Sequence, residues 1–191
     1  MVKPLALILM ASLVNFSPAS GETGKRFEEV EFTFSDDSTE VIFFINVSNN
    51  LRMLSSSAML HGDGRLELLV KQVGNGIVEE SHELTISMEQ VESLMRTAVL
   101  GGLAEWDAAS LHARQLRSRS GRPFSAPSDG PEITILLSLK TYSRADYSRS
   151  DLEKTIRVRS PGYLFEFFPE IKEFKTAEDL ATWMYEMFRA T

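Results

Sequence analysis

Four arginines lie close together in the sequence and have the clearest capacity for binding chemistry. Arg114, Arg117, Arg119 and Arg122 lead into a segment rich in proline and serine, with Phe124 at its centre. A guanidinium group can bind a phosphate or a carboxylate through two parallel hydrogen bonds. The series therefore predicts an anion-binding site for a polysaccharide, a lipid head group or an acidic protein face. The alternative is a solvated surface loop whose arginines offset the acidic remainder of the chain.

The three histidines, His61, His82 and His112, are the obvious candidates for a metal ligand or a base. None has a second histidine at helical metal-binding spacing, and zinc sites need three or four convergent ligands. His61 and His82 fall on the first and third strands of a predicted meander, where only a particular register would bring them together. We expect surface or turn-flanking histidines, and no metal or cofactor.

No catalytic motif stands out. The segment from His61 to Gly64 reads His-Gly-Asp-Gly, which invites a catalytic interpretation, but a tight hairpin needs the same residues. The chain lacks a Gly-x-Ser-x-Gly elbow, a Walker-type phosphate loop and a dinucleotide glycine fingerprint. These absences favour a non-catalytic module. A small hydrolase with a site assembled from distant strands is the alternative, since paired carboxylates leave no local signature.

The middle of the chain must position any such site, and its turns predict an antiparallel meander. Strand-like runs at residues 51–61, 65–73 and 77–86 are separated by Gly-Asp-Gly and Gly-Asn-Gly. Both turns tolerate the positive φ angles of tight hairpins. Next, Ser87 and Gln90 have the spacing of a capping box, which predicts a helix that ends at Gly101 and Gly102.

Further strands are predicted on both sides of this unit. Residues 27–34 alternate between apolar and polar side chains, as in a strand. Residues 40–47 are apolar on both faces and should lie inside the sheet. Residues 132–142 and 152–159 read as a strand pair joined by a polar connection over residues 143–150. The two apolar patterns place Ile133 and Val158 inward, with Arg157 and Arg159 outward.

Helices and loops complete the second half of the chain. Residues 107–117 predict a short helix capped by Asp107, and residues 118–131 a flexible loop with three prolines. Residues 163–174 suggest a connector or short helix. Thr176 then has the position of a cap for the terminal helix, followed by acidic residues that complement the helix dipole.

The N-terminal segment has the pattern of a secretory signal. Residues 1–19 contain one charge, Lys3, then an apolar run over residues 5–14 and small residues before Ala19. The run is short for a membrane span, and an uncleaved anchor is the alternative. We expect cleavage to leave residues 20–25 as a disordered leader, residues 26–191 as one domain, and no integral membrane segment. The protein would then be periplasmic or secreted.

Cysteine content and charge restrict the partners. The chain has no cysteine, which excludes disulfides and a thiol-linked lipid anchor and favours a bacterial envelope or secreted protein. Its formal net charge is −7, although residues 110–160 carry ten Lys and Arg against five Asp and Glu. An acidic protein with one basic segment argues against nucleic-acid binding and leaves a local anion site open.

The order of motifs resembles that of small exported bacterial domains of unknown function. The similarity rests on His61-Gly62-Asp63-Gly64-Arg65, Ile86-Ser87-Met88-Glu89-Gln90-Val91 and Gly101-Gly102-Leu103. It spans residues 51–161 and implies no activity.

Together these patterns predict an α+β domain with a largely antiparallel sheet of about seven strands. The Ser87 helix and the terminal helix should cover one face of the sheet. An exported binding module would then use either the exposed sheet face or the arginine-rich loop, with an anionic envelope component or another protein as its partner.

Overall fold

The computed structural model describes residues 30–49, 54–73, 77–119, 124, 125, 127, 129–145 and 147–191. The signal, the leader and residues 27–29 of the first predicted strand lie outside these ranges. Within the described residues, no helix combines the length and the apolar character needed to cross a membrane.

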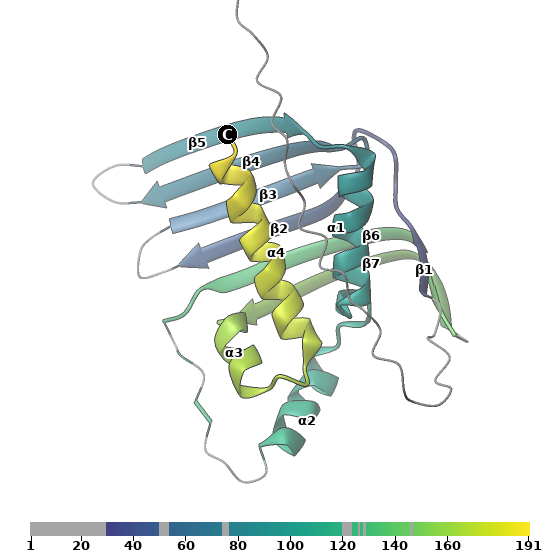
Figure 1. Cartoon of the computed structure of the whole chain (residues 1–191), viewed down its shortest axis with the longest axis vertical. Helices are drawn as coiled ribbons and strands as arrows, with labels where there is room; N and C mark the ends of the chain where they lie inside the picture. Colours follow the sequence, from purple (N-terminus) through teal and green to yellow (C-terminus); the bar gives the residue numbers. More distant parts are fainter. Residues whose placement is uncertain are drawn as a thin grey trace, which may run out of the picture.

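The core of the fold is a single antiparallel sheet of seven strands, which confirms the predicted α+β class. Six strands follow the order β7-β6-β2-β3-β4-β5 (Figure 1). β7 pairs along the whole of β6, so β1 and β2 must share the opposite edge of β6. The strands are β1 (Val30–Thr33), β2 (Val41–Asn49), β3 (Leu54–His61), β4 (Arg65–Val73), β5 (Ile77–Thr85), β6 (Glu132–Arg144) and β7 (Tyr147–Arg159).

The predicted meander is β3, β4 and β5. Its first turn forms as expected: Gly64 has a φ of 90°, and Asp63 accepts a hydrogen bond from the amide of Arg65 at 3.0 Å. The second predicted turn, residues 74–76, lies outside the described residues. β2 lies between β3 and β6, which confirms that its doubly apolar pattern belongs inside the sheet.

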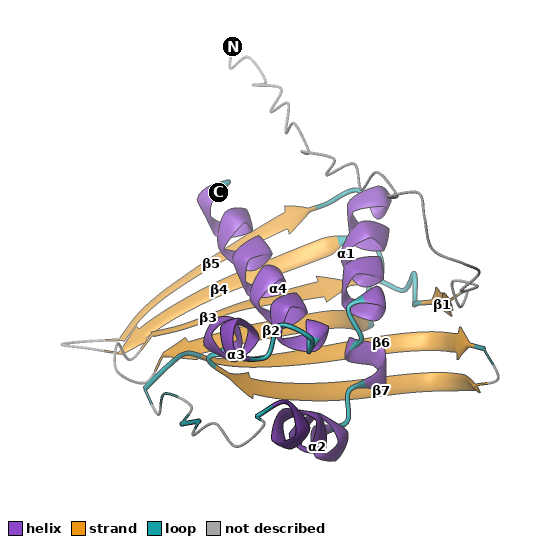
Figure 2. Cartoon of the chain, turned by 60° about the horizontal axis from the view of Figure 1, so that its bottom comes forward, coloured by secondary structure: helices purple, strands orange, loops and turns teal. Residues whose placement is uncertain are grey.

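The helices lie on one side of the sheet (Figure 2). They are α1 (Met88–Leu100), a 3₁₀ turn η1 (Leu103–Glu105), α2 (Ala108–Ser118), α3 (Pro161–Phe167) and α4 (Lys172–Arg189). The capping box of α1 is present, because the Gln90 amide donates to the Ser87 hydroxyl and the Ser87 amide donates to the Gln90 side chain. Asp107 caps α2 as predicted, by accepting from the amide of Ser110 at 2.9 Å.

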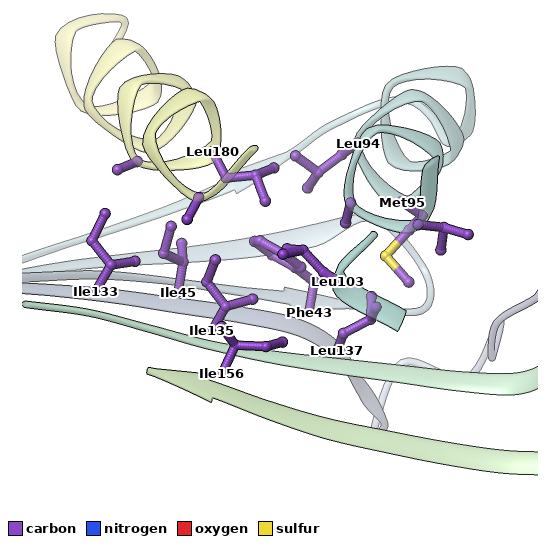
Figure 3. Close-up of a cluster of buried hydrophobic side chains, with 14 of the residues drawn as sticks. Phe43, Ile45, Leu94, Met95, Leu103, Ile133, Ile135, Leu137, Ile156 and Leu180 are labelled. Carbon is purple, nitrogen blue, oxygen red and sulfur yellow. The ribbon is translucent and has the colours of Figure 1, made fainter. Parts of the chain in front are cut away.

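The hydrophobic core fills the space between the helices and the sheet. Alternate residues of β6, including Ile133, Ile135 and Leu137, point toward Leu94 and Leu180 on the two main helices (Figure 3). All of these side chains are at most 6% exposed. Burial of this continuous apolar layer is the main stabilising contribution to the fold.

The start of the terminal helix was predicted wrongly. α4 begins at Lys172, and its N-cap Ile171 makes no side-chain hydrogen bond. Thr176 is instead buried inside the helix, where its hydroxyl donates to the carbonyl oxygen of Lys172 at 3.0 Å. The predicted connector or short helix over residues 163–174 contains most of α3, which confirms the short helix, and also the first residues of α4.

The connection between the last two strands is also shorter than predicted. Most of the polar residues 143–150 belong to β6 and β7, and Arg144 pairs with Tyr147 beside the turn. Ala145 takes a positive φ of 51° without the glycine that such a turn favours.

Candidate functional site

A groove lies where α2 passes beside β7 and the N-terminal part of α4. Its cavity volume is about 440 Å³. Its lining combines aromatic and aliphatic side chains with basic residues: Trp106, Ala108, Leu111, His112, Gln115, Arg119, Phe124, Arg157, Val158, Arg159, Leu164 and Phe174. A mostly apolar concavity with a few charged groups is the usual composition of a small-molecule site.

Arg119 is the predicted anion ligand that the structure places in this groove. Its guanidinium carbon lies 4.8 Å from the centroid of the Phe124 ring, and its Nη2 donates to the Phe124 carbonyl oxygen at 3.4 Å. Among the described residues, its buried Nε has no hydrogen-bond partner. A guanidinium has five N–H donors, so Arg119 retains donors for an incoming anion.

Phe124 holds this part of the predicted loop against α3. Its ring contacts Phe167, Phe168 and Tyr163, with centroids 4.8, 5.0 and 6.0 Å away. Aromatic pairs at these separations stabilise beyond their buried area. Arg119 is therefore positioned from two sides, by its place at the end of α2 and by a ring fixed on α3.

Arg114 and Arg117 do not join Arg119. Arg114 pairs with the buried Glu173 at 2.6 Å and donates to the carbonyl oxygen of Glu170, so it holds α2 against the start of α4. Arg117 is exposed on α2 and does not line the groove, and Arg122 lies outside the described residues. Removing the partner of a buried carboxylate is costly, which gives Arg114 a structural role.

β7 contributes two cations whose place in the site no sequence pattern had indicated. Arg157 and Arg159 border the groove, while their sheet partners are Thr134 and Glu132. Arg159 pairs with Glu132 at 3.0 Å. Their alternation along a predicted strand was readable from the sequence, but the passage of α2 beside that strand was not.

The histidines do not converge. His112 lines the groove, whereas His61 is buried at the end of β3 with its Nε2 3.2 Å from Glu67. His82 on β5 lies beside Glu80. In the described part of the chain, no group of His, Cys, Asp or Glu is arranged to hold a metal ion.

Ser160 is the residue with the most unusual backbone near the groove. It follows β7 directly, precedes α3, and has a φ of 52° and a ψ of 53°. A strained serine between a strand and a helix resembles a hydrolase nucleophile in its setting. However, its buried hydroxyl has no hydrogen-bond partner within the described part of the chain, and an activated serine needs a base within hydrogen-bond reach. Ser160 therefore forms no nucleophile–base pair with any residue that the structure describes.

A polar network lies beside the groove at the end of η1. The Tyr142 hydroxyl donates to Glu105 at 2.5 Å, and Arg144 pairs with the same carboxylate at 2.7 Å. Burial and the neighbouring Glu105 raise the pKa of Tyr142. Burial acts to raise the pKa of Glu105, but the hydrogen bonds from Tyr142 and Arg144 outweigh it and hold that pKa below its usual range.

Comparisons with known proteins give no independent indication of function. No family model matches the chain, and a search of curated proteins finds no significant relative.

Proposed function

We propose that this protein is an exported, non-catalytic binding module that holds an anionic amphiphile in the groove beside α2, β7 and the N-terminal part of α4. Arg119 carries the proposal, because its guanidinium lines an apolar groove and its Nε has no hydrogen-bond partner among the described residues. The anionic group of the ligand would accept hydrogen bonds from Arg119. Its apolar part would lie against Trp106, Phe174 and Leu111. A membrane lipid has this combination of groups, which fits the envelope location expected from the N-terminal pattern.

The charge around the groove supports the same ligand class. Arg157 and Arg159 add positive charge along β7, while the whole chain carries a net charge of −7. A basic site on an acidic protein attracts an anion locally and repels it elsewhere, which favours binding in one orientation.

The proposal can be tested with one ligand pair and one matched pair of variants. Dodecyl phosphate and dodecyl maltoside, both below their micelle-forming concentrations, have the same alkyl chain and differ in charge. Titration calorimetry should show tighter binding of the phosphate. Arg119→Glu should weaken phosphate binding by about tenfold or more, the value of a charge-assisted hydrogen bond.

The control is Arg117→Glu, which makes the same change of charge on an exposed residue of the same helix. It should leave most of the affinity intact. Equal losses in both variants would indicate a general charge effect, and unchanged binding in Arg119→Glu would refute the proposed site.

A further inference from the structure

The face of the sheet opposite the helices is uncovered by any described element (Figures 1 and 2). Its central side chains are Phe44 on β2 and Met59 on β3, which are cross-strand partners and only partly buried. Together with Leu136 they line a hollow of about 520 Å³. Towards the ends of the same strands the surface is small and polar, with Asn46 opposite Ser57. We refer to this surface as the open face.

Glu153 on β7 lines the hollow, but beyond it, towards the end of β7, the two edges of the open face carry opposite charges. Residues directly opposite one another in an antiparallel sheet share a face. Arg157 and Arg159 share theirs with Thr134 and Glu132, and thus project from the open face on β7. On β4, Glu67 is the partner of Met59 and therefore belongs to the open face, and so does Lys71, two repeats of the pleat further along the strand. Their partners on β5, Glu83 and Glu79, project from the open face for the same reason.

Most of these edge charges lack a partner within the protein. In the described part of the chain, the side chains of Lys71, Glu79, Glu83 and Arg157 take part in no hydrogen bond or ion pair. Charged rows of this kind keep an edge strand soluble on its own. Here the row on one edge is also complementary in sign to the row on the other.

The strand order allows this complementarity to be satisfied by a second copy. The centre of the order β7-β6-β2-β3-β4-β5 falls between β2 and β3. A two-fold axis along the strands at this centre places β7 over β5, β6 over β4 and β2 over β3 of the other copy. Packed sheets lie about 10 Å apart with nearly aligned strands, a gap that long side chains can fill from both sides.

The register then matches residues of suitable chemistry across the interface. Phe44 lies over Met59 of the second copy, and Ser48 over its Ser55, because each pair already shares one row of the sheet. Successive cross-strand partners form one row from Arg159 on β7 to Glu79 on β5. The two-fold axis therefore brings Arg159 over Glu79 of the second copy.

The same row also brings Glu132 of β6 over Lys71 of the second copy. Arg157 lies over Ser81, between Glu79 and Glu83. An isologous interface repeats every one of these contacts twice.

The charges also select this axis over the alternative. A two-fold axis across the strands would place β7 over β7 and Arg157 over its own copy. It would likewise bring Glu79 near Glu83 of the second β5. Like charges in such positions oppose association.

We propose that two copies of this chain dock face to face through their open faces, about a two-fold axis that runs along the strands between β2 and β3. The contact has an apolar centre at Phe44 and Met59 and two salt-bridged edges, each formed by β7 of one copy and β5 of the other. Arg157 and Arg159 belong both to this surface and to the border of the groove, whereas Glu79 and Glu83 on β5 belong to this surface alone. The acidic-edge variant therefore tests the dimer without altering the groove that carries the proposed function.

Analytical ultracentrifugation of the protein, in the form that cells produce, tests the proposal. The wild type should sediment as a dimer whose dissociation constant rises with salt. The acidic-edge variant Glu79→Arg/Glu83→Arg and the basic-edge variant Arg157→Glu/Arg159→Glu should each weaken self-association by about a hundredfold, because each faces its own copy with like charges.

Mixing the two variants provides the decisive measurement. In a mixed dimer, arginines on β5 of one copy face glutamates on β7 of the other, and the unmodified pair on the second edge is wild type. An equimolar mixture should therefore associate although neither component does. A wild type that remains monomeric, variants that both still dimerise, or a mixture that stays monomeric would each overturn the proposal.

The matched control reverses two charges on the helix side. Glu166→Arg/Glu186→Arg makes the same change in net charge near the ends of α3 and α4 and should leave the dimer intact. Circular dichroism confirms that each variant is folded. Loss of the dimer in this control would show that association follows net charge, which would also overturn the docking geometry.

Discussion

The two faces of the sheet differ in the way they use apolar residues. On the helix side, β4 buries Leu66 and Leu68 almost completely, with exposures of 0% and 1%. On the open side, Leu69 and Met59 stay partly accessible among serines and charged residues. The helix side therefore provides most of the stability of the fold, and the open side is left available for contact with another molecule.

Adjacent leucines test this contrast directly. Leu68→Ala removes a fully buried side chain and should lower the free energy of unfolding by about 2 to 5 kcal/mol. Leu69→Ala changes the same residue type on the opposite face and should cost about 1 kcal/mol or less. Urea denaturation of both variants measures the difference. Equal losses would mean that the open face is as well covered as the helix side.

The contact between the main helices should show a smaller effect. A Cβ placed on Gly101 would lie 2.2 Å from Oγ1 and 2.4 Å from Cγ2 of Thr176, so Gly101→Ala must displace α4 from the end of α1. We expect a loss of about 1 to 3 kcal/mol, typical of overpacking. Thermal unfolding provides the measurement, and an unchanged midpoint would show that α4 can move freely on the sheet.

The smallest effect is expected at the polar network on the helix side. Tyr142→Phe keeps the buried ring and removes the hydrogen bond to Glu105, at a cost of about 1 to 2 kcal/mol at neutral pH. The folded pKa of Tyr142 is raised, so the wild type should lose stability as the pH rises above about 10, the ordinary tyrosine pKa. The variant should lack this part of the alkaline loss.

Glu105 gives the same variant an acid-side signature. Its folded pKa is lowered, so its stabilising contribution is present above about pH 4.3, the ordinary glutamate pKa, and is lost as the pH falls further. In Tyr142→Phe, which lacks the hydroxyl, this loss of stability at low pH should be smaller than in the wild type. Denaturation curves of the wild type and Tyr142→Phe across the pH range measure both the acid and the alkaline loss of stability. Identical pH profiles for the two proteins would contradict the assigned network.

Local chemistry explains which elements the sequence predicted. The Gly-Asp-Gly turn and the Ser87 capping box are specified by neighbouring residues, and both form as expected. The start of α4 is set differently. Lys172 donates to the carbonyl oxygen of Leu100 at 2.7 Å, and Thr176 packs on Gly101. Contacts with the end of α1 accompany the first turn of α4, and no local cap signals its start.

The same distinction applies to the candidate site. The sequence identified Arg119 together with Arg114, because guanidinium chemistry is readable residue by residue. It could not show that Arg114 forms an ion pair with Glu173, since the two residues are 59 positions apart. The role of β7 was hidden for the same reason, because it depends on where α2 crosses the sheet.

The position of β6 in the sheet also determines the order in which the strands can pair during folding. β2 meets β6 across a separation of 84 residues, as between Ser48 and Glu132, whereas β3, β4 and β5 pair with their neighbours in the chain. During synthesis the edge of β2 must remain unsatisfied until β6 leaves the ribosome. The nascent chain is consequently open to chaperones and prone to aggregation until late in translation.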